Sequence, residues 1–188
     1  MVVARLASSV LLAILVTGCG SSSDPVLYTL AAQPGPTARS GPHVIALRDV
    51  GLAQYLDRPE IVRASENYLL DVSKGDWWGE PLGRMIDRVL AEELSQRLPG
   101  STVIASSGAI GADADTTIEV NVQSFAANGA GQVVLDAQAA ITRARGKPTL
   151  LTKRLTATPT DSSTRAQVAA MSQLLGQFAD VLAAAVKT

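Results

Sequence analysis

The sequence predicts an α+β protein, in which two amphipathic helices pack on one face of a mainly antiparallel sheet to form a two-layer sandwich. Two patterns lead to this prediction. Apolar residues recur at helical spacing over 81–98 and 165–186, whereas they alternate with polar residues over 117–125. Each pattern leaves one apolar side to bury, and a layer of helices packed on a sheet buries both.

Both predicted helices carry a start signal. Pro81 suits the first turn of 81–98, because its fixed φ is helical and the N–H that it lacks has no intrahelical partner there. Thr164, followed three residues later by Gln167, predicts a capping box for the second helix. Pro99 stands directly after the last apolar position of the first helix and ends it.

The other strands are predicted from runs of β-branched and aromatic residues between turn-forming residues. They cover 43–50, 60–65, 68–72, 102–105, 132–142 and 149–158. The second and third of these runs form a hairpin candidate around Glu66 and Asn67. Turns at 128–131 and 145–148 fold 117–158 into an antiparallel meander.

The composition is that of one ordinary globular domain, with 188 residues of which 47% are hydrophobic and 18% charged. Sixteen Lys and Arg residues against 17 Asp and Glu residues leave a formal net charge of −1. This balance excludes the global basic field that holds nucleic acid. One Cys excludes an intramolecular disulfide and a cysteine-based zinc site, and one His excludes a multi-histidine metal cluster.

Residues 1–18 are predicted to be a lipoprotein signal peptide. Arg5 supplies the positive charge, and the apolar run 6–16 is shorter than the roughly 20 residues that a membrane-spanning helix needs. The run ends in the sequence LVTGC, which resembles a bacterial lipobox, in which the cysteine receives diacylglycerol before cleavage ahead of it. Cys19, the only cysteine, is therefore the predicted lipidation site, with palmitate among its acyl chains.

Lipidation at Cys19 would anchor the mature chain to a membrane, because two or three acyl chains make the attachment durable. Gly20 stands where an Asp would resemble the inner-membrane retention signal of enteric bacteria. The sequence therefore predicts the periplasmic face of the outer membrane, provided that the same sorting rule applies.

Three segments make up the predicted organisation. After the signal peptide, residues 19–42 form a lipidated tether and linker with a short strand at 26–30, which could join the edge of the sheet. The stretch 31–42 holds three Pro residues and is too polar and Pro-rich to order itself. Residues 43–188 form a single α+β domain.

Motifs for catalysis are absent from the sequence. There is no nucleophile elbow, phosphate-binding loop, dinucleotide-binding glycine pattern, two-histidine zinc helix or calcium loop. A small lipid-anchored hydrolase remains an alternative, but it needs His43 in a pocket beside a serine and an acid. We therefore predict no enzyme activity, no cofactor and no metal.

Two short segments are candidates for a contact surface, because irregular loops with aromatic residues on a rigid scaffold are common interaction sites. The partner-binding residues that we predict are Tyr55, Leu56, Asp57, Arg58, Pro59, Trp77, Trp78, Glu80, Pro81 and Leu82. Two structural interpretations remain open. An Arg58–Glu60 ion pair beside Pro59 could only fix a bend, and one or both Trp rings could belong to the core.

Four tracts together resemble the PqiC (YmbA)-type family of ABC-transport auxiliary lipoproteins. They are YTL at 28–30 just after the lipobox, YLDRPEIV at 55–62, WWGEPL at 77–82 and VAAMSQ at 168–173. Many relatives have Ala at the position of Gly79, a small-for-small difference. The resemblance covers nearly the whole mature chain.

The resemblance implies a non-catalytic outer-membrane lipoprotein of an intermembrane lipid transport system. In this family picture the lipoprotein self-associates and receives the tip of a tunnel formed by an MCE-domain (PqiB-like) protein, which is anchored in the inner membrane. Such systems carry lipids across the periplasm and support envelope integrity. An alternative of another class is an assembly or structural lipoprotein, which binds an outer-membrane barrel protein by strand addition at an exposed sheet edge.

Overall fold

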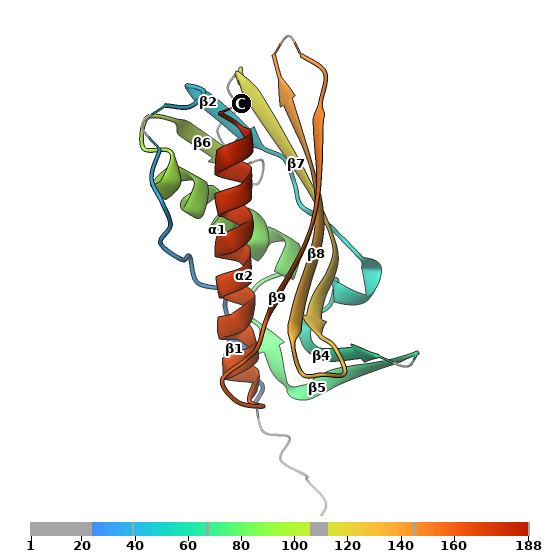
Figure 1. Ribbon diagram of the computed structural model, residues 1–188. Coiled ribbons are helices and arrows are strands. Elements are labelled where there is room, and N and C mark those ends of the chain that lie inside the picture. Colours follow the sequence, from blue (N-terminus) through green and yellow to red (C-terminus); the bar gives the residue numbers. More distant parts are fainter. Residues whose placement is uncertain (1–23, 39, 67, 106–112, 145, 188) are drawn as a thin grey trace, which may run out of the picture.

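The structure of the protein is a computed structural model that describes residues 24–38, 40–66, 68–105, 113–144 and 146–187. The predicted signal peptide, the predicted lipidation site Cys19 and Asn67 of the predicted hairpin lie outside the described residues. Within the described part, nine strands form one sheet and two long helices cover one of its faces (Figure 1). The predicted two-layer α+β sandwich is confirmed.

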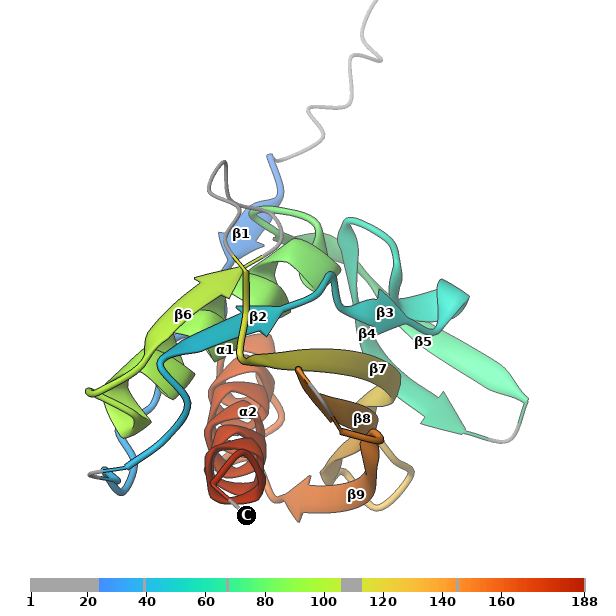
Figure 2. The same ribbon diagram turned by 90° about the horizontal axis from the view of Figure 1, so that it is seen from above.

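The helices are α1 (Leu82–Arg97) and α2 (Thr164–Ala185). Seen from above, the sheet curves around α2, so that both helices lie on its concave side (Figure 2). By length and apolar composition alone α2 could cross a membrane, but most of it is buried inside the domain. We therefore interpret α2 as the core helix of this fold.

The strands vary widely in length. Their bounds are β1 (Val26–Tyr28), β2 (Val44–Leu47), β3 (Gly51–Leu52), β4 (Glu60–Glu66), β5 (Leu69–Trp78), β6 (Thr102–Ala105), β7 (Thr116–Ala127), β8 (Val133–Arg143) and β9 (Thr149–Ala157). A single 3₁₀ turn, Gln54–Leu56, follows β3 within the described residues. The predicted short strand at the start of the chain is β1, which pairs with the edge of the sheet at β5.

Strand β7 organises the sheet. One edge of β7 pairs with β8 along its whole length, and the other edge pairs in turn with β2, β3 and β4. Along β7, Ile118, Val120 and Val122 are buried and the residues between them are exposed or half-buried, as the alternating pattern predicts. The face of the sheet that points away from the helices is therefore exposed to solvent.

The expectation of a mainly antiparallel sheet holds for the long strands alone. The β4–β5 hairpin and the β7–β8–β9 meander are antiparallel, as predicted. The described short-strand pairings, from β1 with β5 to β4 with β7, are parallel. Alternation along one strand does not reveal the direction of its neighbour, so the sequence could not distinguish these cases.

The predicted capping box of α2 is wrong by one residue. Ser163 is the N-cap, and its hydroxyl accepts a hydrogen bond of 3.1 Å from the backbone N–H of Ala166. The hydroxyl of Thr164 instead donates to Asp76 on β5, at 2.6 Å. The Gln167 amide donates to the carbonyl of Val62, so both residues connect α2 to the β4–β5 hairpin.

The segment expected to be a loose linker is fastened to both helices. In this segment, which we call the strap (residues 30–38), the N–H of Ala31 donates to the Ser172 hydroxyl on α2, and that of Ala38 to the carbonyl of Arg97 on α1. The strap forms neither helix nor strand, as its Pro residues predict. Its polar backbone groups find partners on the helices, which its composition could not reveal.

The side chain of Arg97 lies at the centre of this attachment and is 1% exposed. Its guanidinium donates to the Asp180 carboxylate at 2.6 Å, to the carbonyl of Gln33 at 3.0 Å and to that of Gly176 at 2.9 Å. These three acceptors lie on the strap and on α2. Because a buried cation is tolerated only when its donors are satisfied, this network holds the strap in one place.

A second buried ionisable group, Glu93, contacts the strap beside Arg97. Its Oε1 accepts a hydrogen bond of 2.8 Å from the N–H of Gln33. Burial raises the pKa of Glu93 from its ordinary value of 4.5 to about 7, although the Gln33 hydrogen bond and the charge of Arg97 act in the opposite direction. The folded protein therefore holds a proton on this carboxyl at pH values where the unfolded chain has lost it.

We predict that Glu93 makes the protein more stable in mild acid. Because its pKa is higher in the folded state, its stabilisation is complete below about pH 4.5 and is lost as the pH rises through about 7. Melting temperature should therefore fall between about pH 5.5 and about pH 7.5, and Glu93→Gln should flatten this fall. The exposed Glu92→Gln on the same helix is the control, and equal slopes in all three proteins would contradict the prediction.

A second prediction concerns the space at Gly35. A Cβ added there would fall on the guanidinium of Arg97, whereas a Cβ at Gly75 would meet nothing within 4 Å. Gly35→Ala should lower the free energy of unfolding by about 2–4 kcal/mol, because it displaces a buried charge from its partners. Chemical denaturation measures the difference. Gly75→Ala should stay close to the wild type, and equal effects of both substitutions would show that the strap is loosely held.

Candidate functional site

The two segments predicted as a contact surface lie side by side. Glu60 at the start of β4 pairs with Trp77 near the end of β5, and the N–H of Trp78 donates to the carbonyl of Pro59 at 2.7 Å. We call residues 55–60 and 77–82 together the corner surface. It lies where the 3₁₀ turn, the hairpin base and the start of α1 meet.

Three of the predicted residues form the buried base of the corner surface. Leu56, Trp78 and Leu82 are 2%, 6% and 1% exposed and belong to the hydrophobic core. The interpretation that at least one Trp packs in the core therefore holds for Trp78. These side chains support the surface from below and are not themselves available to a partner.

The other predicted residues reach the outside to different extents. Asp57, Pro59 and Pro81 are exposed, and Tyr55, Arg58, Trp77 and Glu80 are half-buried. The Tyr55 hydroxyl donates to the carbonyl of Gln123 at 3.3 Å and so ties the 3₁₀ turn to β7. The indole N–H of Trp77 is buried and has no hydrogen-bond partner within the described residues.

Ion pairs stiffen both halves of the corner surface. Arg58 Nε lies 3.4 Å from Glu60 Oε2, which is the pair that the sequence suggested for the bend at Pro59. Arg88 on α1 donates through Nη2 to Glu80 at 2.6 Å. All four side chains are at least one-third exposed, so each pair contributes at most about 1 kcal/mol. Their role is to orient the surface rather than to hold the fold together.

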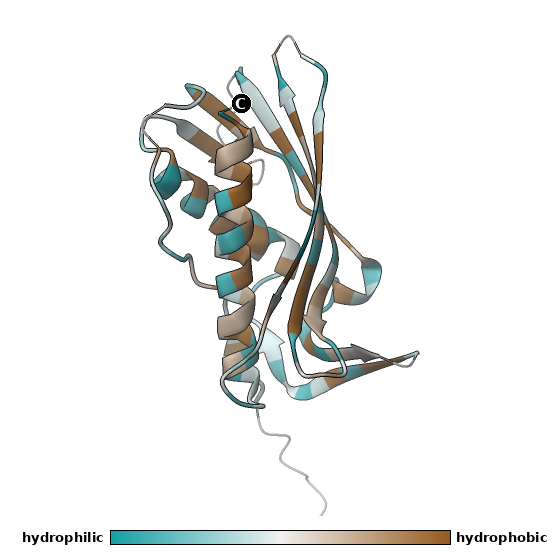
Figure 3. Ribbon diagram, viewed as in Figure 1, coloured by the Kyte–Doolittle hydropathy of each residue, from teal (hydrophilic) through white to brown (hydrophobic). Residues whose placement is uncertain are grey.

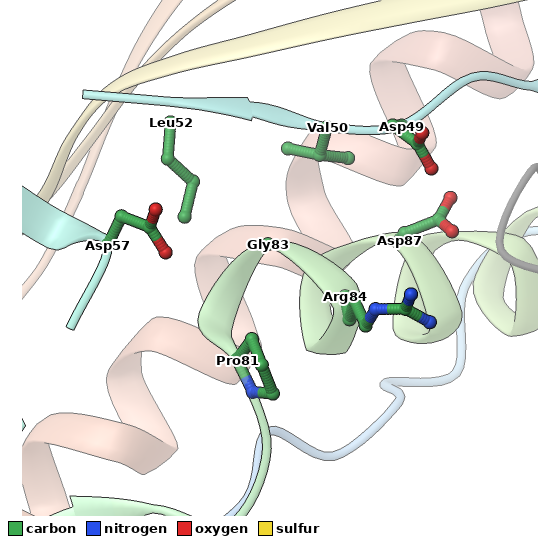
Figure 4. Close-up of a pocket in the computed structure, with 8 residues that line it drawn as sticks. All are labelled: Asp49, Val50, Leu52, Asp57, Pro81, Gly83, Arg84 and Asp87. Carbon is green, nitrogen blue, oxygen red and sulfur yellow. The ribbon is translucent and has the colours of Figure 1, made fainter. Parts of the chain in front are cut away.

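Two shallow hollows border the corner surface and share Asp57 and Pro81. One, of about 270 Å³, lies between the two predicted segments, and the other, of about 280 Å³, lies between the start of α1 and the β2–β3 connection. In the second hollow Asp49 and Asp87 approach each other beside Arg84 (Figure 4). Neither hollow is large and enclosed enough to hold a lipid chain, and both suit side chains of a protein partner.

The structure does not favour the hydrolase alternative. His43 is exposed immediately before β2, where its carbonyl accepts from the N–H of Thr102. A catalytic histidine needs a partner acid and a nucleophile in an enclosed site. Within the described residues no group of three or more His, Cys, Asp or Glu side chains is arranged to hold a metal ion.

Residues 28–183, most of the chain, match the family of ABC-type transport auxiliary lipoprotein components. The chain belongs to this family. The predicted membership in the PqiC (YmbA)-type family is thereby confirmed. As the family's description states, its members are lipoproteins and auxiliary components of transporters, which indicates a membrane-anchored, non-enzymatic protein that acts with a partner.

Several solved structures resemble this member of the family. A crystal structure of a protein described as uncharacterized has a TM-score of 0.73 and 20% identity, covering 87% of this chain and 99% of that chain. A Xanthomonas campestris protein of family DUF330 has a TM-score of 0.72 and 17% identity, covering 86% and 94%. PelC from Paraburkholderia phytofirmans, crystallised as a dodecamer, has a TM-score of 0.48 and 14% identity, covering 86% and 100%. No curated protein matches the sequence.

The sequence does not predict an exposed apolar end of the β4–β5 hairpin. Tyr68, Leu69 and Leu70 at the end of the β4–β5 hairpin are exposed, although the run 68–72 was predicted as an ordinary strand. A signal was present in the sequence, because turns are normally polar and this one is followed directly by three large apolar or aromatic residues. The alternation rule assigns the strand but does not reveal that its first residues lack a covering layer.

We predict that the two tryptophans of the corner surface have different roles. Trp78→Ala should lower the free energy of unfolding by about 3–5 kcal/mol, because it empties a buried site in the core. Trp77→Ala should leave the fold largely intact and weaken complex formation. Thermal unfolding and co-purification of the partner measure the two effects. If both variants lose stability and both keep the partner, the corner surface only closes the edge of the fold.

Proposed function

We propose that this lipoprotein is a non-catalytic outer-membrane subunit of an MCE/PqiABC-like intermembrane lipid transport system. It docks the MCE-domain (PqiB-like) protein at the periplasmic face of the outer membrane, self-associates there and supports envelope integrity. Cys19 carries the lipid anchor. The observation that carries the proposal is that two of the tracts that resemble the family, 55–62 and 77–82, lie side by side and leave several of their side chains at the surface.

The corner surface has the features of a docking site for a protein. Its base is rigid, because Leu56, Trp78 and Leu82 are anchored in the core. Its outer side combines Pro residues, a half-buried Trp and two partly exposed ion pairs around shallow hollows, a composition similar to that of many protein interfaces. Shallow hollows of this size suit a transport system in which the lipid passes through the partner's tunnel rather than through this domain.

The position of the anchor also supports the proposal. Cys19 lies seven positions before Val26, a distance of at most about 24 Å when extended. Strand β1 pairs residue by residue with Asp76–Trp78, and the N–H of Gly79 donates to the carbonyl of Tyr28 at 2.9 Å. An anchored Cys19 therefore holds the corner surface close to the membrane.

We predict that the exposed rim of the corner surface is needed to recover the partner. The native lipoprotein would be crosslinked in cells, purified from gently solubilised membranes and analysed by mass spectrometry, together with its Cys19 peptide. Asp57→Arg should reduce recovery of the MCE-domain protein by about tenfold or more, because it reverses a charge at the rim of both hollows. Asp113→Arg, at another exposed aspartate, is the matched control and should leave recovery unchanged.

Other outcomes would redirect the proposal. Recovery of an outer-membrane barrel protein in place of an MCE-domain protein, with an acylated Cys19, would favour the assembly or structural lipoprotein. Equal recovery from both Asp variants would move the docking site away from the corner surface. An unmodified Cys19 would remove the anchor on which the outer-membrane location depends.

A further inference from the structure

The end of the β4–β5 hairpin projects from the domain. Strand β4 pairs with β7 only at Ala64, opposite Ala127, so the hairpin beyond this point continues as a two-stranded ribbon without a further strand beside it (Figure 1). Its end is apolar (Figure 3). We call Tyr68, Leu69 and Leu70 the hairpin tip, and their exposed fractions are 109%, 75% and 44%.

Folding alone does not account for the hairpin tip. Tyr68 has a φ of 65°, in the left-handed region where Gly or Asn normally stands in a two-residue hairpin turn. A bulky aromatic residue is strained there, and three exposed apolar or aromatic side chains in a row contribute no burial. Isolated two-stranded ribbons are also marginally stable in water. Both the strain and the exposure point to a contact outside the domain.

A bend in β5 sets the direction of the ribbon. Between the pairs Val62–Val72 and Glu60–Trp77, β5 has extra residues that bulge out of the ladder. Asp76 fixes this bulge, because its carboxylate accepts hydrogen bonds from Ser73 at 2.9 Å and from Thr164 at 2.6 Å. The Thr164 hydrogen bond, with the one from Ser73, holds the pKa of Asp76 below its usual value. The hairpin tip is therefore held in one direction by α2.

The hairpin tip lies at the anchored end of the molecule. Val26 pairs with Asp76, and Leu69 lies seven positions before Asp76 on β5, at most about 24 Å away. Cys19 likewise lies seven positions before Val26. Among the described residues six large hydrophobic side chains are exposed, and five of them lie on β1 or at the tip: Val26, Leu27, Tyr68, Leu69 and Leu70. The sixth, Leu150, lies near the far end of the β8–β9 ladder.

We propose that the hairpin tip inserts into the interfacial layer of the bilayer that holds the acyl chains of Cys19, as a second membrane contact. This inference rests on the proposed lipidation of Cys19 and does not depend on the MCE partner. Exposed Tyr and Leu side chains match the chemistry of that layer, which takes amphipathic aromatic rings together with aliphatic side chains. The tether is short enough to bring the tip to the bilayer and long enough to let it insert.

The charge of the ribbon indicates what kind of lipid surface it fits. Arg63 and Lys74 balance Glu66 and Asp71, so residues 63–74 carry no formal net charge. Attraction to anionic headgroups therefore contributes little, and apolar burial must supply the binding. The contact should form on zwitterionic lipids and should change little with salt concentration.

The test uses a fluorescent label at the hairpin tip of the lipidated full-length protein. Because lipidation blocks Cys19, the only native cysteine, Leu69→Cys introduces a unique thiol for an environment-sensitive nitrobenzoxadiazole dye. Leu150→Cys is the matched control, since both leucines are 75% exposed. Each labelled protein would be reconstituted alone into phosphatidylethanolamine and phosphatidylglycerol vesicles, with and without nitroxide-labelled lipid. Mass spectrometry of the Cys19 peptide would first verify the anchor.

The proposal expects the label at Leu69 to be roughly twofold brighter than that at Leu150 and to be quenched by nitroxide lipid, at low and high salt. Equal access of aqueous iodide to both labels would overturn it. Shielding at Leu69 that grows with the ratio of protein to lipid, without quenching by nitroxide lipid, would instead identify a second copy as the occupant. An unmodified Cys19 would overturn it as well, whereas loss of the MCE partner in cells would leave it standing.

A second variant separates a membrane role from a folding role. Tyr68→Gly relieves the strain at the positive φ, so the melting temperature should stay the same or rise. The same substitution removes the aromatic ring, so nitroxide quenching of the Leu69 label should fall by about half or more. A tip with only a structural role would show the stability change and no change in quenching.

Discussion

The buried guanidinium of Arg97 connects the anchored end of the chain to the two helices. It holds the carbonyl of Gln33 on the strap, the carbonyl of Gly176 on α2 and the carboxylate of Asp180 in one network. The strap follows directly after β1, which has only three residues and would be a weak edge strand alone. The membrane anchor is therefore connected to the core through side chains and not only through a short strand. A force applied to the predicted lipid at Cys19 would be transmitted through β1 and the strap to α1 and α2.

Local periodicity was enough to predict the layers of this fold, and the failures share one physical cause. The apolar stripes of 81–98 and 165–186 correspond to α1 and α2, and the alternation over 117–125 lies within β7. What could not be predicted depends on partners distant in sequence. The strap becomes ordered through Arg97 and Glu93, and Thr164 binds Asp76 in place of its own helix end. The parallel pairings around β7 likewise involve strands brought together by long connections.

The corner surface shows a similar limit for the site. The structure brings together residues 55–59 and 77–82, the two segments that the sequence predicts as a contact surface. Trp77 and Trp78 are neighbours on β5, so their side chains face opposite sides of the sheet. The sequence does not show which of the two faces the core. In the structure Trp78 packs in the core and Trp77 is half-buried. The resemblance to the family identified the tracts, and only the fold assigns each side chain to the base or the rim.

The arrangement of the corner surface and the hairpin tip on the same hairpin has a consequence for docking. A domain held by one lipid anchor can rotate about it, and a partner that docks must then remove this rotational freedom, at a cost in free energy. A second contact at the tip restricts the rotation to one axis, because the Asp76 bulge holds the ribbon rigidly to α2. The corner surface lies at the base of that same ribbon, where Glu60 pairs with Trp77. With both contacts in place, the membrane itself presents the corner surface in a limited set of orientations before any partner arrives.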